Sequence, residues 1–358
     1  MLGAIIGDLI GSTYEETNTN TKDFPLFTSK SRISDDSIMT LAVADIIQKN
    51  SIYDKDEIID TFKAWAMAYP DRGYGVRFAN WVFSNAKEPY YSMGNGAAMR
   101  ISPVGWYARS LSEVKDYSKR ITEVTHNHPD AIKAAEVVAS LIYYARRGKS
   151  KQFLKEYIEK YYDIDFDYED LKNNYTFDAT CEGSVPQALY CFLISESFID
   201  CLRTSISIGG DSDTIPCIAC SIAEAYYKHI NPAIIKKMYE YLPQGDPNPY
   251  DVISQFLYDM EDDYVTSEVL TSKHHIIYVL ENGVGFYGHA RRIIVLKDYI
   301  IERLNRACFN KMNTVKRMLK YINSYEDLKD TIDYINTLTI DYDISFKLFK
   351  NSKDAGLK

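Results

Sequence analysis

The chain reads GGDSDTIPCIACSIA at residues 209–223, where an acidic, hydroxyl-rich segment leads into an almost wholly apolar run. The same order occurs earlier, where Ser34-Asp35-Asp36-Ser37 precedes a second apolar run at residues 38–47. Both runs are long enough for helices and are apolar on nearly every face, so we expect two helices inside the protein core. Four carboxylates would then lie at the starts of two buried helices.

Two interpretations of these paired clusters remain open. Asp and Ser are common N-caps, and acidic residues in the first turn interact favourably with the helix dipole. A cap needs only one acceptor, whereas each cluster supplies two carboxylates and neighbouring hydroxyls. If both helix starts face the same end of the core, the carboxylates repel one another unless a divalent cation joins them. Oxygen ligands of this kind suit Mg²⁺ and similar hard ions.

Helical periodicity dominates the first two-thirds of the sequence. It predicts helices at 36–49, 55–68, 112–123, 130–147, 150–161, 184–194, 197–207, 214–228, 232–241 and 249–262. Alternating strand patterns are scarce in this part, which favours an all-α fold. We therefore expect one all-α domain over residues 1–263.

The character of the sequence changes after Asp263. The stretch His275–Leu280, the turn Glu281-Asn282-Gly283 and residues 284–287 predict a β-hairpin. Helical patterns return at 289–306 and 311–322. Residues 264–358 contain 15 Lys+Arg and 11 Asp+Glu, a net charge of +4, against −13 in the part before them. We expect a small, net basic, mixed α/β C-terminal appendage at residues 264–358.

The composition narrows the class of protein. The chain has 46% hydrophobic and 25% charged residues, as soluble globular proteins do. Every apolar run is interrupted before it reaches membrane-spanning length, so we expect no membrane association. The N-terminus lacks the basic and small-residue features of a signal peptide, and the six cysteines show no disulfide spacing, so we expect a cytoplasmic protein with reduced thiols. The acidic excess argues against general nucleic-acid binding.

Several polar and glycine-rich motifs lie between the predicted helices. Exposed backbone N–H groups in loops such as Arg72-Gly73-Tyr74-Gly75 suit phosphate oxygens, although a single loop of this kind is weak support for a site. The Gly7-Asp8 pair and Glu15 could equally reflect tight helix packing followed by a polar loop. His126, just before a predicted helix, could be a structural imidazole.

Taken together and in order, these motifs resemble the ADP-ribosylglycohydrolase family, of the dinitrogenase-reductase-activating glycohydrolase type. The matching segments are Gly7-Asp8 to Tyr14-Glu15, Ser34-Asp35-Asp36-Ser37, Arg72-Gly73-Tyr74-Gly75, Gly94-Asn95-Gly96-Ala97-Ala98-Met99-Arg100, Thr125-His126-Asn127-His128-Pro129 and Gly209-Gly210-Asp211-Ser212-Asp213-Thr214. The resemblance covers residues 1–262. It implies an orthogonal all-α bundle with a binuclear metal centre.

The resemblance also implies a role for each matching residue. Two Mg²⁺ or Mn²⁺ ions would be held by Ser34, Asp35, Asp36, Asp211, Asp213 and Thr214. Catalytic roles would fall to Glu15, Asp35 and Asp213. Substrate contacts would come from Gly73, Tyr74, Gly75, Ser92, Gly94, Asn95 and His126.

The implied reaction is hydrolysis of the glycosidic bond between ADP-ribose and an acceptor. The acceptor stays open: an ADP-ribosylated protein, a nucleic acid or a small molecule could each be the substrate. A competing hypothesis is an ADP-ribose-binding module or an inactive family member. A third hypothesis concerns residues 291–320, which contain nine basic residues and only two acidic ones. This stretch could bind nucleic acid or a protein partner, or it could be a solvated helix face.

Overall fold

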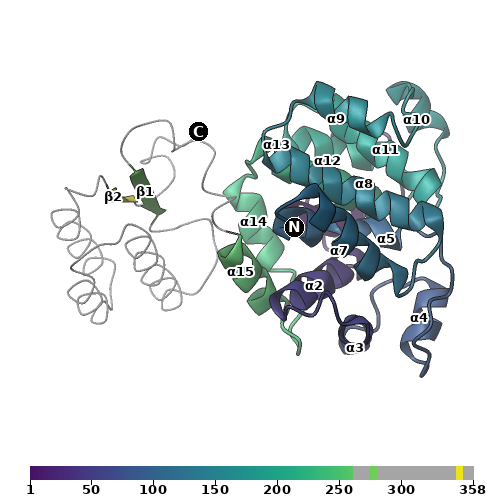
Figure 1. The fold of residues 1–358 in the computed structure, drawn as a ribbon. Helices are drawn as coiled ribbons and strands as arrows, with labels where there is room; N and C mark the ends of the chain where they lie inside the picture. The colour runs from purple at the N-terminus through teal and green to yellow at the C-terminus, as the bar shows by residue number, and fades with distance from the viewer. Residues whose placement is uncertain (261–274, 281–343, 350–358) are drawn as a thin grey trace. The chain divides into compact units, whose positions relative to one another are not determined.

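The computed structural model describes residues 1–260, 275–280 and 344–349. It divides the chain into two compact units, Met1–Asp263 and Tyr264–Lys358. The first unit confirms the all-α prediction, because no strand forms among its described residues and its helices run in several directions (Figure 1). Its helices are α1 (Leu2–Gly11), α2 (Asp35–Gln48), α3 (Lys55–Ala68), α4 (Val76–Val82), α5 (Gly96–Met99), α6 (Ser102–Tyr107), α7 (Leu111–Glu123), α8 (Pro129–Arg146), α9 (Lys151–Ile158), α10 (Tyr168–Asn174), α11 (Cys181–Ile194), α12 (Phe198–Ser207), α13 (Thr214–Tyr227), α14 (Pro232–Tyr239) and α15 (Pro249–Asp259).

All ten helices predicted from periodicity are present. The bounds of α3 match the prediction, whereas α9 ends three residues earlier than expected. Five described helices were not among those predicted. One is α1, whose ten residues were interpreted only in terms of tight helix packing. The others are α4, α5, α6 and α10, which span only four to seven residues each. Such helices are too short to show a repeat of 3.6 residues.

Helix α13 forms the centre of the first unit. It is buried over nearly its whole length and packs against α1, α8, α11 and α12. Its closest approach is to α1, where glycines recur every fourth residue on the facing side. A Cβ at Gly7 would lie 2.3 Å from the Pro216 carbonyl oxygen, and one at Gly11 would lie 1.9 Å from that of Ser212. The two helices therefore touch backbone to backbone, and only glycine permits this spacing.

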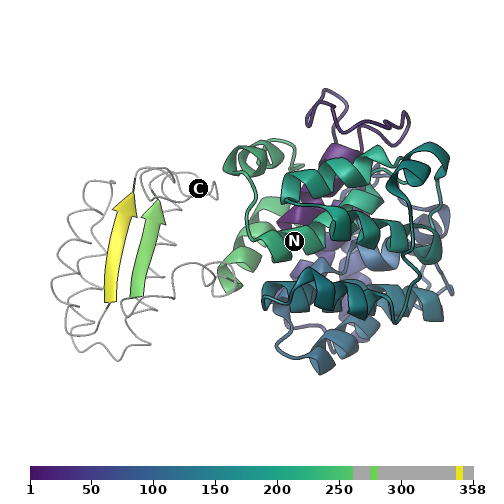
Figure 2. The ribbon, with the colours of Figure 1, turned by 90° about the horizontal axis from the view of Figure 1, so that it is seen from above.

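The second unit contains two described strands, β1 (His275–Leu280) and β2 (Ile344–Phe349). They pair in parallel, with His275 opposite Ile344, and lie side by side in Figure 2. The strand predicted at 275–280 is thus present, while the rest of the predicted hairpin and the helices at 289–306 and 311–322 lie outside the described residues. Parallel pairing requires a long connection, so the Asn282-Gly283 turn does not join these two strands. Within the described part of the chain, no helix is both long and apolar enough to cross a bilayer.

Candidate active site between two acidic clusters

The first acidic cluster begins α2. Ser34 is the N-cap, and its Oγ accepts the Asp36 N–H at 3.2 Å. The Asp35 N–H donates to the Arg72 carbonyl oxygen at 2.7 Å. Capping therefore accounts for the serine hydroxyl and not for the carboxylates. Asp36 is buried, and its Oδ1 has no hydrogen-bond partner among the described residues.

A third acidic residue holds this cluster against α1. Asp8 is fully buried, and its Oδ2 accepts the N–H of Ser34 and that of Ser37, each at 3.1 Å. The Ser37 hydroxyl also donates to this oxygen. The sequence analysis assigned no role to Asp8, although a lone carboxylate inside the apolar stretch LGAIIGDLIG was a signal. Asp8 fixes the start of α2 to α1.

The second acidic cluster begins α13 and meets the first. Thr214 Oγ1 donates to Asp36 Oδ2 at 3.2 Å, which joins the two helix starts directly. Asp213 does act as a cap, since its Oδ1 accepts the Thr214 N–H at 2.8 Å. Asp211 instead accepts a hydrogen bond from Asn95 Nδ2 at 2.7 Å. The structure thus brings together residues of both clusters and the Asn95 loop, as the resemblance implies.

Burial raises the pKa of several carboxylates of this site, and for most of them neighbouring carboxylates add to the effect. Burial raises the pKa of Asp35 to about 8, with the charge of Asp8 adding to the effect. Burial also raises the pKa of Asp8 to about 6. The pKa values of Asp36 and Asp213 lie well above the usual range, because both are buried and face like charges. Without a cation, ionising this cluster is costly.

The donor set suits a hard divalent ion, but the side chains are not gathered into a complete ligand shell. Among the described residues, no three His, Cys, Asp or Glu side chains lie close enough to hold a metal ion as they stand. The oxygen-only donors and the unpartnered Asp36 Oδ1 nonetheless fit Mg²⁺ or Mn²⁺, which also accept hydroxyl, water and substrate oxygens. Ser34 and Thr214 would supply the hydroxyls.

The Gly73 loop lies beside the first cluster. Gly73 has φ of +92°, in the left-handed region, and a Cβ there would lie 3.5 Å from Asp35 Oδ1. Burial, and in second place the charge of Asp35, raise the pKa of the Tyr74 hydroxyl. Gly75 is exposed and serves as the N-cap of α4, with no neighbour within 4 Å of a Cβ placed on it. The structure therefore brings Gly73 and Tyr74, but not Gly75, toward the carboxylates.

The Asn95 loop is held from two sides. An isolated antiparallel bridge joins Gly94 to Thr180, and the Asn95 N–H donates to the Ala179 carbonyl oxygen at 2.8 Å. Ser92 Oγ accepts the Gly94 N–H at 3.1 Å. His126 lies behind this loop, with its Nε2 toward the glycines.

Glu15 lies on the long segment between α1 and α2. It is half-buried, and burial together with the charge of Asp211 raises its pKa. Its nearest cationic partner is Arg32, at 4.0 Å. The carboxylate of Glu15 therefore interacts electrostatically with Asp211 of the second cluster, as the resemblance implies.

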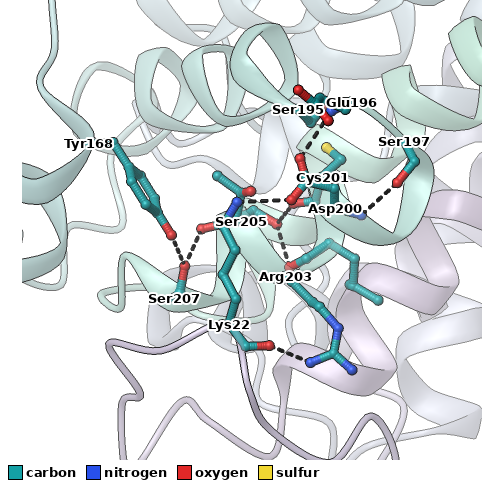
Figure 3. Close-up of polar contacts among 12 residues, drawn as sticks. Lys22, Tyr168, Ser195, Glu196, Ser197, Asp200, Cys201, Arg203, Ser205 and Ser207 are labelled. Atoms are coloured by element: carbon teal, nitrogen blue, oxygen red, sulfur yellow. Dashed lines mark hydrogen bonds and ion pairs between the residues drawn. The ribbon is translucent and has the colours of Figure 1, made fainter.

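The segment that carries Glu15 is attached to α12. Figure 3 shows Arg203 Nη1 directed at the Lys22 carbonyl oxygen, and the same group donates to the Phe24 carbonyl oxygen at 3.1 Å. Lys22 Nζ in turn donates to Asp200 Oδ1 at 2.9 Å. A hollow of about 360 Å³ borders the segment and is lined by Asn18, Thr19, Asn20, Lys172, Tyr175, Ile208 and Gly209.

Asn18 was also missed in the sequence. Its Oδ1 accepts the Ser212 hydroxyl hydrogen at 2.8 Å, so the segment after Glu15 contacts the second cluster. No sequence motif marked this asparagine, because the contact joins residues 194 positions apart.

Known proteins resemble this chain in sequence and in fold. The family model for ADP-ribosylglycohydrolase matches residues 1–267. The chain is 25% identical to human ADP-ribosylhydrolase ARH3 over 304 residues, covering 63% of this chain and 84% of that protein. It is 24% identical to the ADP-ribosyl-[dinitrogen reductase] glycohydrolase of Rhodospirillum rubrum, covering 63% and 83% respectively. A solved structure of an ADP-ribosylglycohydrolase-related protein complex shares the fold, with a TM-score of 0.51 and 20% identity over 67% of this chain and 93% of that one.

Proposed function

The chain belongs to the ADP-ribosylglycohydrolase family, and from this premise we propose that it hydrolyses the glycosidic bond between ADP-ribose and an acceptor with the help of two divalent metal ions. One observation carries the proposal: the starts of α2 and α13 meet at the Thr214–Asp36 hydrogen bond, with Asp36 Oδ1 left unpartnered. A protein that needed these residues only as caps would have no use for an unsatisfied buried carboxylate oxygen.

The residues that would hold the ions are Ser34, Asp35, Asp36, Asp211, Asp213 and Thr214. Bound there, the ions would supply positive charge that binds vicinal ribose hydroxyls and stabilises developing negative charge. Mg²⁺ and Mn²⁺ both suit these oxygen donors.

The chain's own residues perform the remaining tasks. The carboxylates of Asp35 and Asp213 would stabilise the positive charge that develops at the anomeric carbon. The raised pKa of Glu15 suits a group that exchanges a proton with the attacking water or the leaving group. The loops at Gly73 and at Gly94 would bind the diphosphate, since their backbones can approach its oxygens closely.

We propose that the acceptor occupies the hollow lined by Asn18, Thr19 and Asn20, on the segment that carries Glu15. Its lining of carboxamides, one ammonium group and one phenol suits a polar acceptor. A panel of ADP-ribosylated peptides, nucleic acids and small glycosides, assayed for ADP-ribose release, would identify the class. A macromolecular partner for the basic residues at 291–320 remains a separate proposal, which rests on charge alone.

The decisive test combines metal removal with substitution of the unpartnered carboxylate. We expect ADP-ribose release to stop in chelator and to return with Mg²⁺ or Mn²⁺. Asp36→Asn should abolish this return while the protein stays folded, because it removes the charge and keeps the shape. Full turnover by verified metal-free enzyme would overturn the metal proposal. Tight ADP-ribose binding without turnover on any acceptor would favour a binding module.

A further inference from the structure

His126 is a buried imidazole whose two nitrogens face different surroundings. The side chain is 6% exposed, and its ring packs edge-on against Tyr90 with 5.9 Å between ring centroids. A Cβ placed on Gly96 would lie 3.1 Å from His126 Nε2, and one on Gly94 would lie 3.6 Å away. Nε2 therefore points at the glycine loop of the candidate substrate site.

The other nitrogen, Nδ1, faces a hydroxyl and a guanidinium. Thr125 Oγ1 lies 2.8 Å from His126 Nδ1, and Arg100 Nη2 lies 3.4 Å from it. Arg100 Nη2 also donates to Thr125 Oγ1 at 2.8 Å. A guanidinium group can only donate, so its contact with Nδ1 requires that nitrogen to accept. The threonine oxygen also accepts from the guanidinium and can turn its own hydrogen toward Nδ1.

The guanidinium thus requires Nδ1 to be an acceptor, and the threonine hydroxyl can satisfy it as a second donor. A neutral imidazole with an acceptor at Nδ1 carries its proton on Nε2. Burial, together with the positive charges of Arg100 and Arg77, keeps the pKa of His126 well below its usual value, which is consistent with a neutral ring. The proton on Nε2 then points at the loop.

Arg100 is an unusual choice for a purely structural residue. It is 1% exposed, and no carboxylate among the described residues lies within ion-pairing distance of it. The ring of Phe62 lies 4.6 Å from the guanidinium carbon and offsets part of the desolvation cost. An apolar side chain would fill the same volume without burying a cation.

We propose that Arg100 and Thr125 are positioning residues that hold His126 as the neutral Nε2–H tautomer, so that the ring donates a hydrogen bond to a phosphate oxygen at the glycine loop. The identity of the oxygen rests on the proposed function, whereas the tautomer does not. Arg100 can only donate, which makes His126 Nδ1 an acceptor, and the Thr125 hydroxyl donates its hydrogen to the same nitrogen.

The tautomer can be read directly by NMR on the full chain labelled with ¹⁵N-histidine. Two-bond ¹H–¹⁵N correlations near pH 7 distinguish the two neutral tautomers from the protonated ring. The chain has six histidines, so a His126→Gln spectrum assigns the signal. We expect an Nε2–H pattern in the protein without ligand. An Nδ1–H or imidazolium pattern would overturn the proposal.

The second measurement is the affinity for ADP-ribose, determined by calorimetry. Thr125→Val removes the hydroxyl at nearly constant volume and should weaken binding about tenfold, whereas Thr125→Ser should stay within about twofold of wild type. Thr122→Val is a matched control, because this buried hydroxyl has no partner among the described residues. Equal affinity of the Thr125→Val and Thr125→Ser variants would overturn the positioning role. If the wild type bound no ADP-ribose, the proposed function would fail while the spectrum still decided the tautomer.

Discussion

Replacing Gly11 by alanine tests whether the spacing of α1 and α13 sets the geometry of the site. The added Cβ would lie 1.9 Å from the Ser212 carbonyl oxygen and 2.9 Å from Asp213 Cα. Cβ contacts below 3.0 Å essentially do not occur, so the backbones must separate by about 1.1 Å at this point. On α1, Gly11 is close to Asp8, which anchors the first cluster, and its Cβ would approach Asp213 of the second cluster. The separation would therefore change the distance between the two clusters.

Two free-energy terms compete in this variant. Alanine favours a helix over glycine by about 1 kcal/mol, whereas overpacking of a rigid core costs about 1–3 kcal/mol. Because the clash involves backbone atoms of two buried helices, we expect the cost to prevail and the free energy of unfolding to fall by about 1–2 kcal/mol. A displacement of about 1 Å at the reacting groups should lower kcat/KM by about 100-fold.

The measurements are urea unfolding and the rate of ADP-ribose release, corrected for the folded fraction. Gly3→Ala is the matched control. Its Cβ would lie 2.1 Å from the Cys220 carbonyl oxygen, a similar clash, but Gly3 is about 12 Å away from Gly11 along α1. It should lose stability to a similar extent and keep most of its activity. Wild-type stability and kcat/KM in Gly11→Ala would refute the reasoning.

Three further outcomes are expected. Glu15→Gln should bind ADP-ribose nearly as wild type but turn it over at least tenfold more slowly, as single-turnover kinetics would show; unchanged kcat would make Glu15 a structural loop residue. In chelator, the free energy of unfolding should fall as pH rises from about 4 to 8, because folded Asp35, with a pKa of about 8, keeps a proton that the unfolded chain releases near 3.8. This contribution is complete below pH 3.8, and saturating Mg²⁺ should flatten the slope in melting experiments. A chain ending at Asp263 should still cleave a small ADP-ribosylated compound but cleave a macromolecular substrate more slowly. The loss of rate should be largest at low salt, where the charges of residues 264–358 are least screened. Unchanged rates on every substrate would exclude a role for residues 264–358 in binding the macromolecule.

The sequence predicted those features of the first unit that depend on long repeats. Helical periodicity predicted the long helices, and paired carboxylates before two of them indicated a shared site on the condition that the two helix starts meet. The Thr214–Asp36 hydrogen bond fulfils that condition. Short helices such as α5 were not predicted, because they depend on tertiary contacts such as the Gly94–Thr180 bridge. The roles of Asp8 and Asn18 were not predicted for a related reason. Their partners are distant in sequence, and a single polar residue carries no periodic signal.

Several contacts that hold the segment carrying Glu15 are made to its backbone carbonyl oxygens and do not depend on its side chains. Arg203 holds it through the carbonyl oxygens of Lys22 and Phe24, and the Tyr241 hydroxyl donates to that of Thr28. Every amino acid supplies a carbonyl oxygen, so these anchors survive substitution within the segment. Apart from Asn18, which contacts Ser212, side chains at the hollow can therefore diverge while the acidic clusters on α2 and α13 stay as they are. Exchange of the residues after Glu15 offers a route by which acceptor preference evolves, or is engineered, separately from the chemistry.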